Sequence, residues 1–134
     1  MDSRVGEKTV RVFLVDDNHF FLESLTFILN LKRDMEVIGT SKSGTDALNF
    51  LEQNRPDVVI VDMMLPDMDG IALLESIRKR FEVPVIILSM HEEYRNHALR
   101  RGAFSYLVKG EGLDHLYDAI RRAFHEYSVI NRGD

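Results

Sequence analysis

Polar residues directly follow four short apolar runs of this sequence, and their side chains could do chemistry together. They are the carboxylates of Asp16, Asp17 and Asp62, the hydroxyl of Ser89 and the ammonium of Lys109. Carboxylates crowded together must bind a cation or raise their pKa values, and Mg²⁺ prefers oxygen ligands. A cation, a lysine and a hydroxyl around one carboxylate would neutralise and orient the oxygens of a phosphoryl group. An aspartate can itself be the nucleophile that forms an aspartyl phosphate.

The apolar runs that precede these residues have the composition of buried strands. We predict strands over residues 10–15, 35–39, 58–61, 83–88 and 104–108. Helical spacing of apolar residues predicts helices that begin near Asn18, Ser43 and Asp69, a weaker one from His91 to Arg101, and a last one over residues 113–127. The helix after Asn18 has a wide apolar face. The sequence therefore alternates strands with helices throughout.

This alternation predicts an α/β fold of the flavodoxin-like (βα)5 type, a doubly wound parallel sheet with right-handed crossovers. The common five-stranded order is 2-1-3-4-5, which makes the first and third strands neighbours. Asp16, Asp17 and Asp62 would then meet at the carboxyl edge of the sheet, where ligands bind in open α/β folds.

The composition fits one globular domain. The chain has 134 residues, 45% of them hydrophobic, and no cysteine, so it needs no disulfides and offers no thiolate metal ligands. We expect residues 1–8 to be disordered, residues 9–128 to form the domain and residues 129–134 to be a tail. No apolar run is long enough for a membrane span, no signal peptide is visible, and the absence of cysteine suits a reducing cytoplasm. A net charge of −5 argues against direct binding of nucleic acid.

The segment from His91 to Arg101 is the weakest of the predicted helices. Only Tyr94, Ala98 and Leu99 are available to bury in it. Elements with few buried contacts have low local stability and are the ones recruited to move. We therefore expect this helix to respond to events at the sheet edge.

Each polar residue alone has an ordinary structural explanation. Asp16 and Asp17 could cap the following helix, Ser89 could cap the next one, Lys109 could be a solvated loop residue and Asp62 a turn residue. The functional interpretation depends on the fact that one sheet edge collects all of them.

Together these residues resemble the receiver domain of two-component response regulators (CheY-like), over residues 9–128. The matching motifs are the pair Asp16-Asp17, the segment 62–70 (Asp-Met-Met-Leu-Pro-Asp-Met-Asp-Gly), Ser89, and residues 106–109 (Tyr-Leu-Val-Lys). The resemblance implies that Asp62 accepts a phosphoryl group from a phosphohistidine on a sensor histidine kinase or phosphotransfer protein.

The resemblance also implies a divalent cation, Mg²⁺ or Mn²⁺. Asp17, Asp62 and the backbone carbonyl of Met64 would coordinate it directly, and Asp16 would act mainly through water. Lys109 would pair with a phosphoryl oxygen.

Other matching positions would switch or time the response. Ser89 would bind the phosphoryl group and Tyr106 would turn inward, which changes the surface formed by residues 91–101, residues 104–108 and the last helix. Met64 and His91 lie two residues beyond Asp62 and Ser89 and would tune the lifetime of the aspartyl phosphate; the alternative for His91 is an ordinary exposed residue at the start of the next helix.

Gly110 follows the lysine where this family often has proline, which resembles the NarL/LuxR-like branch. That branch usually carries a DNA-binding domain after the receiver; none is expected within this chain, although the full-length protein could have one. Phosphorylation could produce a homodimer. The implied reaction is self-phosphorylation from phosphohistidine or small phosphodonors, followed by autodephosphorylation, rather than classical enzymatic turnover.

Two other functions remain open at this point. One is a phosphorylation-independent protein-binding module, a pseudo-receiver. The other is a small phosphatase with an aspartate nucleophile, of the haloacid dehalogenase type. Those phosphatases place a second aspartate two positions after the nucleophile, and this chain has Met64 there.

Overall fold

The computed structural model describes residues 8–131, and the side chains of residues 8–127. Its elements are β1 (Val10–Val15), α1 (His19–Asn30), β2 (Met35–Ser41), α2 (Gly44–Gln53), β3 (Val58–Val61), α3 (Gly70–Arg80), β4 (Val85–Ser89), α4 (Arg95–Arg100), β5 (Ser105–Val108) and α5 (Leu113–Asn131). The expected disorder of residues 1–7, and the last residues of the expected tail, lie outside the described residues.

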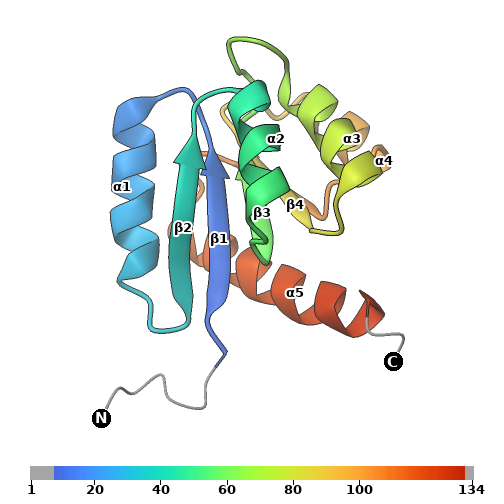
Figure 1. Cartoon of the computed structure of the whole chain (residues 1–134). Helices are drawn as coiled ribbons and strands as arrows, with labels where there is room; N and C mark the ends of the chain where they lie inside the picture. Colours follow the sequence, from blue (N-terminus) through green and yellow to red (C-terminus); the bar gives the residue numbers. More distant parts are fainter. Residues whose placement is uncertain (1–7, 132–134) are drawn as a thin grey trace.

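The five strands form one parallel sheet in the order β2-β1-β3-β4-β5, which confirms the predicted fold. Helices cover both faces of the sheet (Figure 1). Helices α1 and α5 pack on one face around Leu25 and Ile120, while α2, α3 and α4 pack on the other around Leu73 and Ala98. A parallel sheet needs this double cover because both faces of its strands are apolar.

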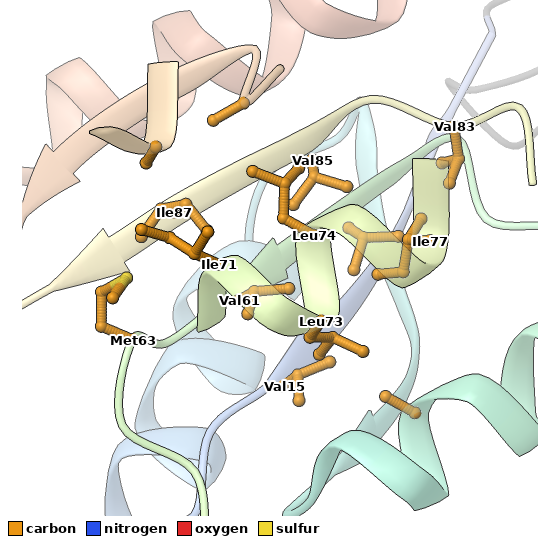
Figure 2. Packing of buried hydrophobic residues seen from close by; sticks show 14 of the residues in the cluster. Val15, Val61, Met63, Ile71, Leu73, Leu74, Ile77, Val83, Val85 and Ile87 are labelled. Atoms are coloured by element: carbon orange, nitrogen blue, oxygen red, sulfur yellow. The ribbon is translucent and has the colours of Figure 1, made fainter. Parts of the chain in front are cut away.

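The packing of α3 against the sheet holds the ends of the central strands in place. Leu73, Leu74 and Ile77 of α3 are fully buried and lie over Val61 and Ile87 of the central strands (Figure 2). Close packing of this kind resists movement, because each buried apolar side chain contributes roughly 1.5–3 kcal/mol. The ends of β3 and β4 are therefore held rigidly.

Three helices begin where the sequence predicted, and the cap expected at Asn18 is confirmed. The side chain of Asn18 accepts a hydrogen bond from the backbone N–H of Phe21 (3.0 Å), and Ser43 accepts one from Asp46 (3.1 Å). Asp69 does the same for Ala72 (2.8 Å). Each cap satisfies a backbone donor that the helix itself cannot.

Helix α4 differs from its prediction. It begins at Arg95 rather than His91 and ends at Arg100, and Tyr94 provides no side-chain cap. Of its three candidate apolar residues only Ala98 is buried; Tyr94 and Leu99 stay exposed. The backbone N–H of His91 donates a hydrogen bond to the Ser89 Oγ (3.0 Å). The residues after β4 therefore form a turn before the helix starts.

The other differences are at element ends. Strand β2 continues to Ser41, and α5 runs on to Asn131, whereas the sequence pattern ended that helix near Tyr127. The described residues, 8–131, contain no helix long and apolar enough to cross a membrane.

Candidate functional site

Three carboxylates meet at the carboxyl edge of the sheet, as the topology requires. Val15 of β1 pairs with Val61 of β3, so the next residues, Asp16 and Asp62, leave neighbouring strands side by side. Carboxylate oxygens of Asp16, Asp17 and Asp62 all lie within 4.8 Å of one another. Asp16 and Asp62 are nearly buried, and Asp17 is exposed.

Lys109 enters this group from the end of β5. Its Nζ lies 2.7 Å from an oxygen of Asp16 and 3.7 Å from an oxygen of Asp62. The ammonium also lies 4.1 Å from the ring centroid of Phe21, which covers it from α1. The backbone N–H of Lys109 donates to the carbonyl of Ser89 (2.7 Å) and so fixes the chain where the lysine projects.

The electrostatics of the site favour a bound cation. Burial raises the pKa of Asp62, the charge of Asp16 raises it further, and Lys109 only partly offsets these effects. The site thus holds three carboxylates and one lysine, so it keeps a net negative charge. An all-oxygen cluster of this kind fits a hard divalent cation such as Mg²⁺. The residues present therefore fit the cation implied by the sequence.

Ser89, His91 and Tyr106 form a second group joined by hydrogen bonds. The buried Ser89 Oγ accepts from the backbone N–H of His91 (3.0 Å), and the hydroxyl of Tyr106 donates to the His91 carbonyl. The Tyr106 ring is buried, and this burial raises the pKa of its hydroxyl. The ring is thus already inside, while the imidazole of His91 is exposed beside Glu93.

Arg95 connects this second group to α4. Its Nη1 donates to the carbonyl of Tyr106 (2.7 Å), and its guanidinium lies 5.5 Å from the Tyr106 ring centroid. Its Nε also pairs with Glu92 at 3.1 Å. The first residue of the weakest helix is therefore tied to the strand that carries Lys109.

The loop between β3 and α3 closes tightly behind Asp62. The N–H of Gly70 donates to the carbonyl of Met63 (2.7 Å), and a Cβ at Gly70 would lie 2.5 Å from the Asp62 carbonyl oxygen. Only glycine permits this approach. Met64 pairs with Asp69 in an isolated bridge, and the residue is 56% exposed. The side chain of Met63 instead lies in the core beside Ile71 and Ile87 (Figure 2).

Gly110 has a backbone reason to be glycine. Its φ is +93°, in the left-handed region, and nothing lies within 4 Å of a Cβ built there. Proline fixes φ at about −65°, so it could not take this conformation.

The structure thus brings Asp16, Asp17, Asp62 and Lys109 together, and places Ser89, Tyr106 and His91 in an adjoining hydrogen-bonded group. Sequence reasoning missed the contacts of Phe21, Arg95 and Asp67. Phe21 and Arg95 carried no signal, because their contacts come from distant elements. Asp67 stood in the recognised motif, but its partners belong to α2.

Comparisons with known proteins agree with this geometry. The family model of the response regulator receiver domain matches residues 12–121. The transcriptional regulatory protein DegU of Brevibacillus brevis is 31% identical over 124 residues, which cover 90% of this chain and 52% of DegU. This chain spans about half the length of that relative.

Solved structures give the same result. A response regulator receiver domain protein from Clostridium thermocellum superposes with a TM-score of 0.83 at 31% identity, covering 90% of this chain and 98% of that one. The signal receiver domain of NarL from Mycobacterium tuberculosis has a TM-score of 0.77 at 27% identity, covering 85% and 98%. The second similarity agrees with the NarL/LuxR-like branch expected from Gly110.

Proposed function

We propose a reaction for this chain on the basis of its family: the chain belongs to the response regulator receiver domains of two-component signalling. Asp62 is the phosphoacceptor, and a phosphohistidine on a sensor histidine kinase or phosphotransfer protein is the donor. The observation that carries this proposal is the position of Asp62: it follows β3 directly, with Asp16, Asp17 and Lys109 around it.

In the proposed step an oxygen of the Asp62 carboxylate attacks the phosphorus. The new P–O bond forms as the P–N bond of the phosphohistidine breaks, and the leaving imidazole nitrogen takes up a proton. Water later attacks the same phosphorus and releases phosphate, which restores the carboxylate. The chain undergoes this cycle on its own side chain instead of turning over a separate substrate.

The surrounding residues supply charge and orientation. The Lys109 ammonium lies 3.7 Å from Asp62, so it can pair with a phosphoryl oxygen while Asp16 keeps it in place at 2.7 Å. Asp17, Asp62 and the Met64 carbonyl would hold Mg²⁺ or Mn²⁺, with Asp16 acting mainly through water. The cation would neutralise phosphoryl oxygens as charge develops on them.

The switch would start at Ser89. Its Oγ accepts the N–H of His91, and the His91 carbonyl accepts the hydroxyl of Tyr106. If Ser89 turns to donate to the phosphoryl group, the His91 backbone loses one partner and its bond to Tyr106 changes with it. The effect then reaches α4 through Arg95, which alters the α4–β5–α5 surface.

The remaining expectations concern timing and partners. Exposed Met64 and His91 would tune the lifetime of the aspartyl phosphate by controlling the approach of water. Since this chain covers 52% of DegU, we propose that a longer protein carries the output, regulation of transcription through a separate DNA-binding domain. Phosphorylation would favour a homodimer.

The test is intact-protein mass after incubation with acetyl phosphate, in Mg²⁺ or in EDTA. We expect the mass of one added phosphoryl group in Mg²⁺, and no adduct in EDTA or in Asp62→Asn. An adduct on Asp62→Asn would show that another residue is the phosphoacceptor. A folded wild-type protein that gains no adduct and binds no fluoroberyllate would favour the pseudo-receiver function.

A further inference from the structure

We propose that Asp67 is a positioning residue for the cation site: it clamps the β3–α3 loop, residues 62–69, to the first turn of α2 and thereby fixes the Met64 carbonyl. This inference rests on the proposed function, because it concerns the cation that the phosphoryl transfer uses.

The clamp consists of three hydrogen bonds to one carboxylate. The Oδ1 atom of Asp67 accepts from the backbone N–H of Gly44 at 2.9 Å. Its Oδ2 atom accepts from the backbone N–H of Thr45 at 2.9 Å and from the Thr45 hydroxyl at 2.7 Å. Gly44 and Asp67 are 23 residues apart in the sequence, so the clamp joins two separate elements.

Two of these donors are backbone N–H groups at the start of α2, which the helix cannot satisfy itself. A carboxylate is a suitable partner, since the helix dipole places partial positive charge there. The hydrogen bonds from Gly44 and Thr45 lower the pKa of Asp67 to about 2, so the carboxylate is charged at neutral pH. The contact therefore combines geometry with favourable electrostatics.

A second contact beside the clamp leaves the loop little freedom. Met68 packs directly against Gly44, where a Cβ would collide with its side chain. Met64 is bridged to Asp69, which caps α3 through the N–H of Ala72 (2.8 Å). The loop is thus fixed to α3 at one end and to α2 in its middle.

Met64 lies between Asp62 and Asp67, and its side chain is exposed, so core packing does not hold it. The orientation of its carbonyl depends on the backbone of the loop. A Mg²⁺ site demands nearly ideal octahedral geometry, so a mobile carbonyl ligand lowers the affinity of the site for Mg²⁺. Outer contacts that orient metal ligands are typically worth about 10–100-fold in affinity.

The experiment compares Asp67→Asn with Asp46→Asn. The amide side chain introduced by Asp67→Asn would keep one acceptor oxygen but present an amide donor to the remaining N–H groups. Asp46 lies in the first turn of the same helix, is exposed, and is not an acceptor of the clamp, so its substitution removes the same charge without the contact. Mg²⁺ affinity is measured by titration calorimetry on the whole chain, at a temperature where circular dichroism shows every variant folded.

We expect Mg²⁺ to bind about tenfold more weakly to Asp67→Asn, and with little change to Asp46→Asn. Thr45→Ala, which removes only the hydroxyl bond, should lie between wild type and Asp67→Asn. With acetyl phosphate, Asp67→Asn should need more Mg²⁺ for half-maximal phosphorylation yet approach the wild-type rate at saturation.

Three results would overturn the proposal. One is a lower melting temperature for Asp67→Asn with unchanged Mg²⁺ affinity, which would make the clamp merely structural. Another is an equal loss of Mg²⁺ affinity in Asp67→Asn and Asp46→Asn, which would show that only the removed charge matters. The third is wild-type protein that binds no Mg²⁺, which would sink the proposed function as well. The first two leave that function intact.

Discussion

The ammonium of Lys109 rests on Asp16, 2.7 Å away, and only approaches Asp62, at 3.7 Å. Both members of the closer pair are largely buried, with side-chain exposures of 13% and 5%. The lysine therefore has a structural partner that is different from the residue it serves in the proposed reaction. This arrangement places a positive charge beside Asp62 without neutralising it fully.

We predict that Lys109→Gln destabilises the metal-free protein by about 3–5 kcal/mol, because removing one member of a buried pair leaves the other charge uncompensated. Asp16→Asn in the same background should recover part of the loss. The measurement is urea unfolding of both single variants and the double variant in EDTA. A coupling energy of about 0.5–3 kcal/mol is expected for residues in contact; strictly additive losses would show that the pair does not interact in solution.

Arg95 is predicted to control the stability of α4. Arg95→Ala removes the hydrogen bond to the Tyr106 carbonyl (2.7 Å) from a helix whose only buried residue is Ala98. Backbone amide exchange in α4 should accelerate about tenfold, which corresponds to the loss of one charge-assisted hydrogen bond. Exchange in the central strands should be unaffected.

The matched control is Arg100→Ala in the same helix, since Arg100 bonds only back to the Asn96 carbonyl (3.3 Å) among the hydrogen bonds of the described residues. Equal acceleration in both variants would mean that helix propensity, rather than the contact with Tyr106, governs α4.

The parallel sheet and the clustering of acidic residues were predictable from the sequence. Runs of apolar residues end sharply at Asp16 and Asp62, and the register Val15 to Val61 follows once the strands are neighbours. The caps at Asn18 and Asp69 were also predictable, because they depend on residues three positions away. Local patterns and chain topology carry this information.

Contacts between distant residues were not predictable. The sequence places Lys109 at the same edge as three carboxylates, but a difference of about 1 Å decides its partner. The helix after Asn18 has apolar residues on more than one face, and its pattern alone does not tell that Phe20 and Phe27 are exposed while Leu25 is buried. The start of α4 depends on the hydrogen bond that Ser89 accepts from His91 and on the one that Arg95 donates to Tyr106, and periodicity reveals neither.

Gly110 offers a test of backbone conformation alone. Its φ of +93° is unfavourable for a residue with a Cβ, yet the space around it is open. Gly110→Ala should therefore cost about 1–2 kcal/mol through backbone strain without steric collision. Asparagine tolerates the left-handed region better, so Gly110→Asn should cost less. Chemical denaturation ranks the variants, and equal stabilities of all three proteins would contradict the positive φ.

The pH dependence of the Asp67 clamp has a definite sign. The hydrogen bonds from Gly44 and Thr45 lower the pKa of Asp67 from 3.8 to about 2. A carboxyl whose pKa is lower in the folded state adds stability above pH 3.8, and this contribution disappears as the pH falls toward 2. The melting temperature of wild type should therefore exceed that of Asp67→Asn at neutral pH, and the difference should shrink between about pH 4 and pH 2. Asp46→Asn, melted under the same conditions, controls for the loss of charge at this end of α2. If the gap between wild type and Asp67→Asn stayed constant down to pH 2, the carboxylate would not be the group that holds the loop.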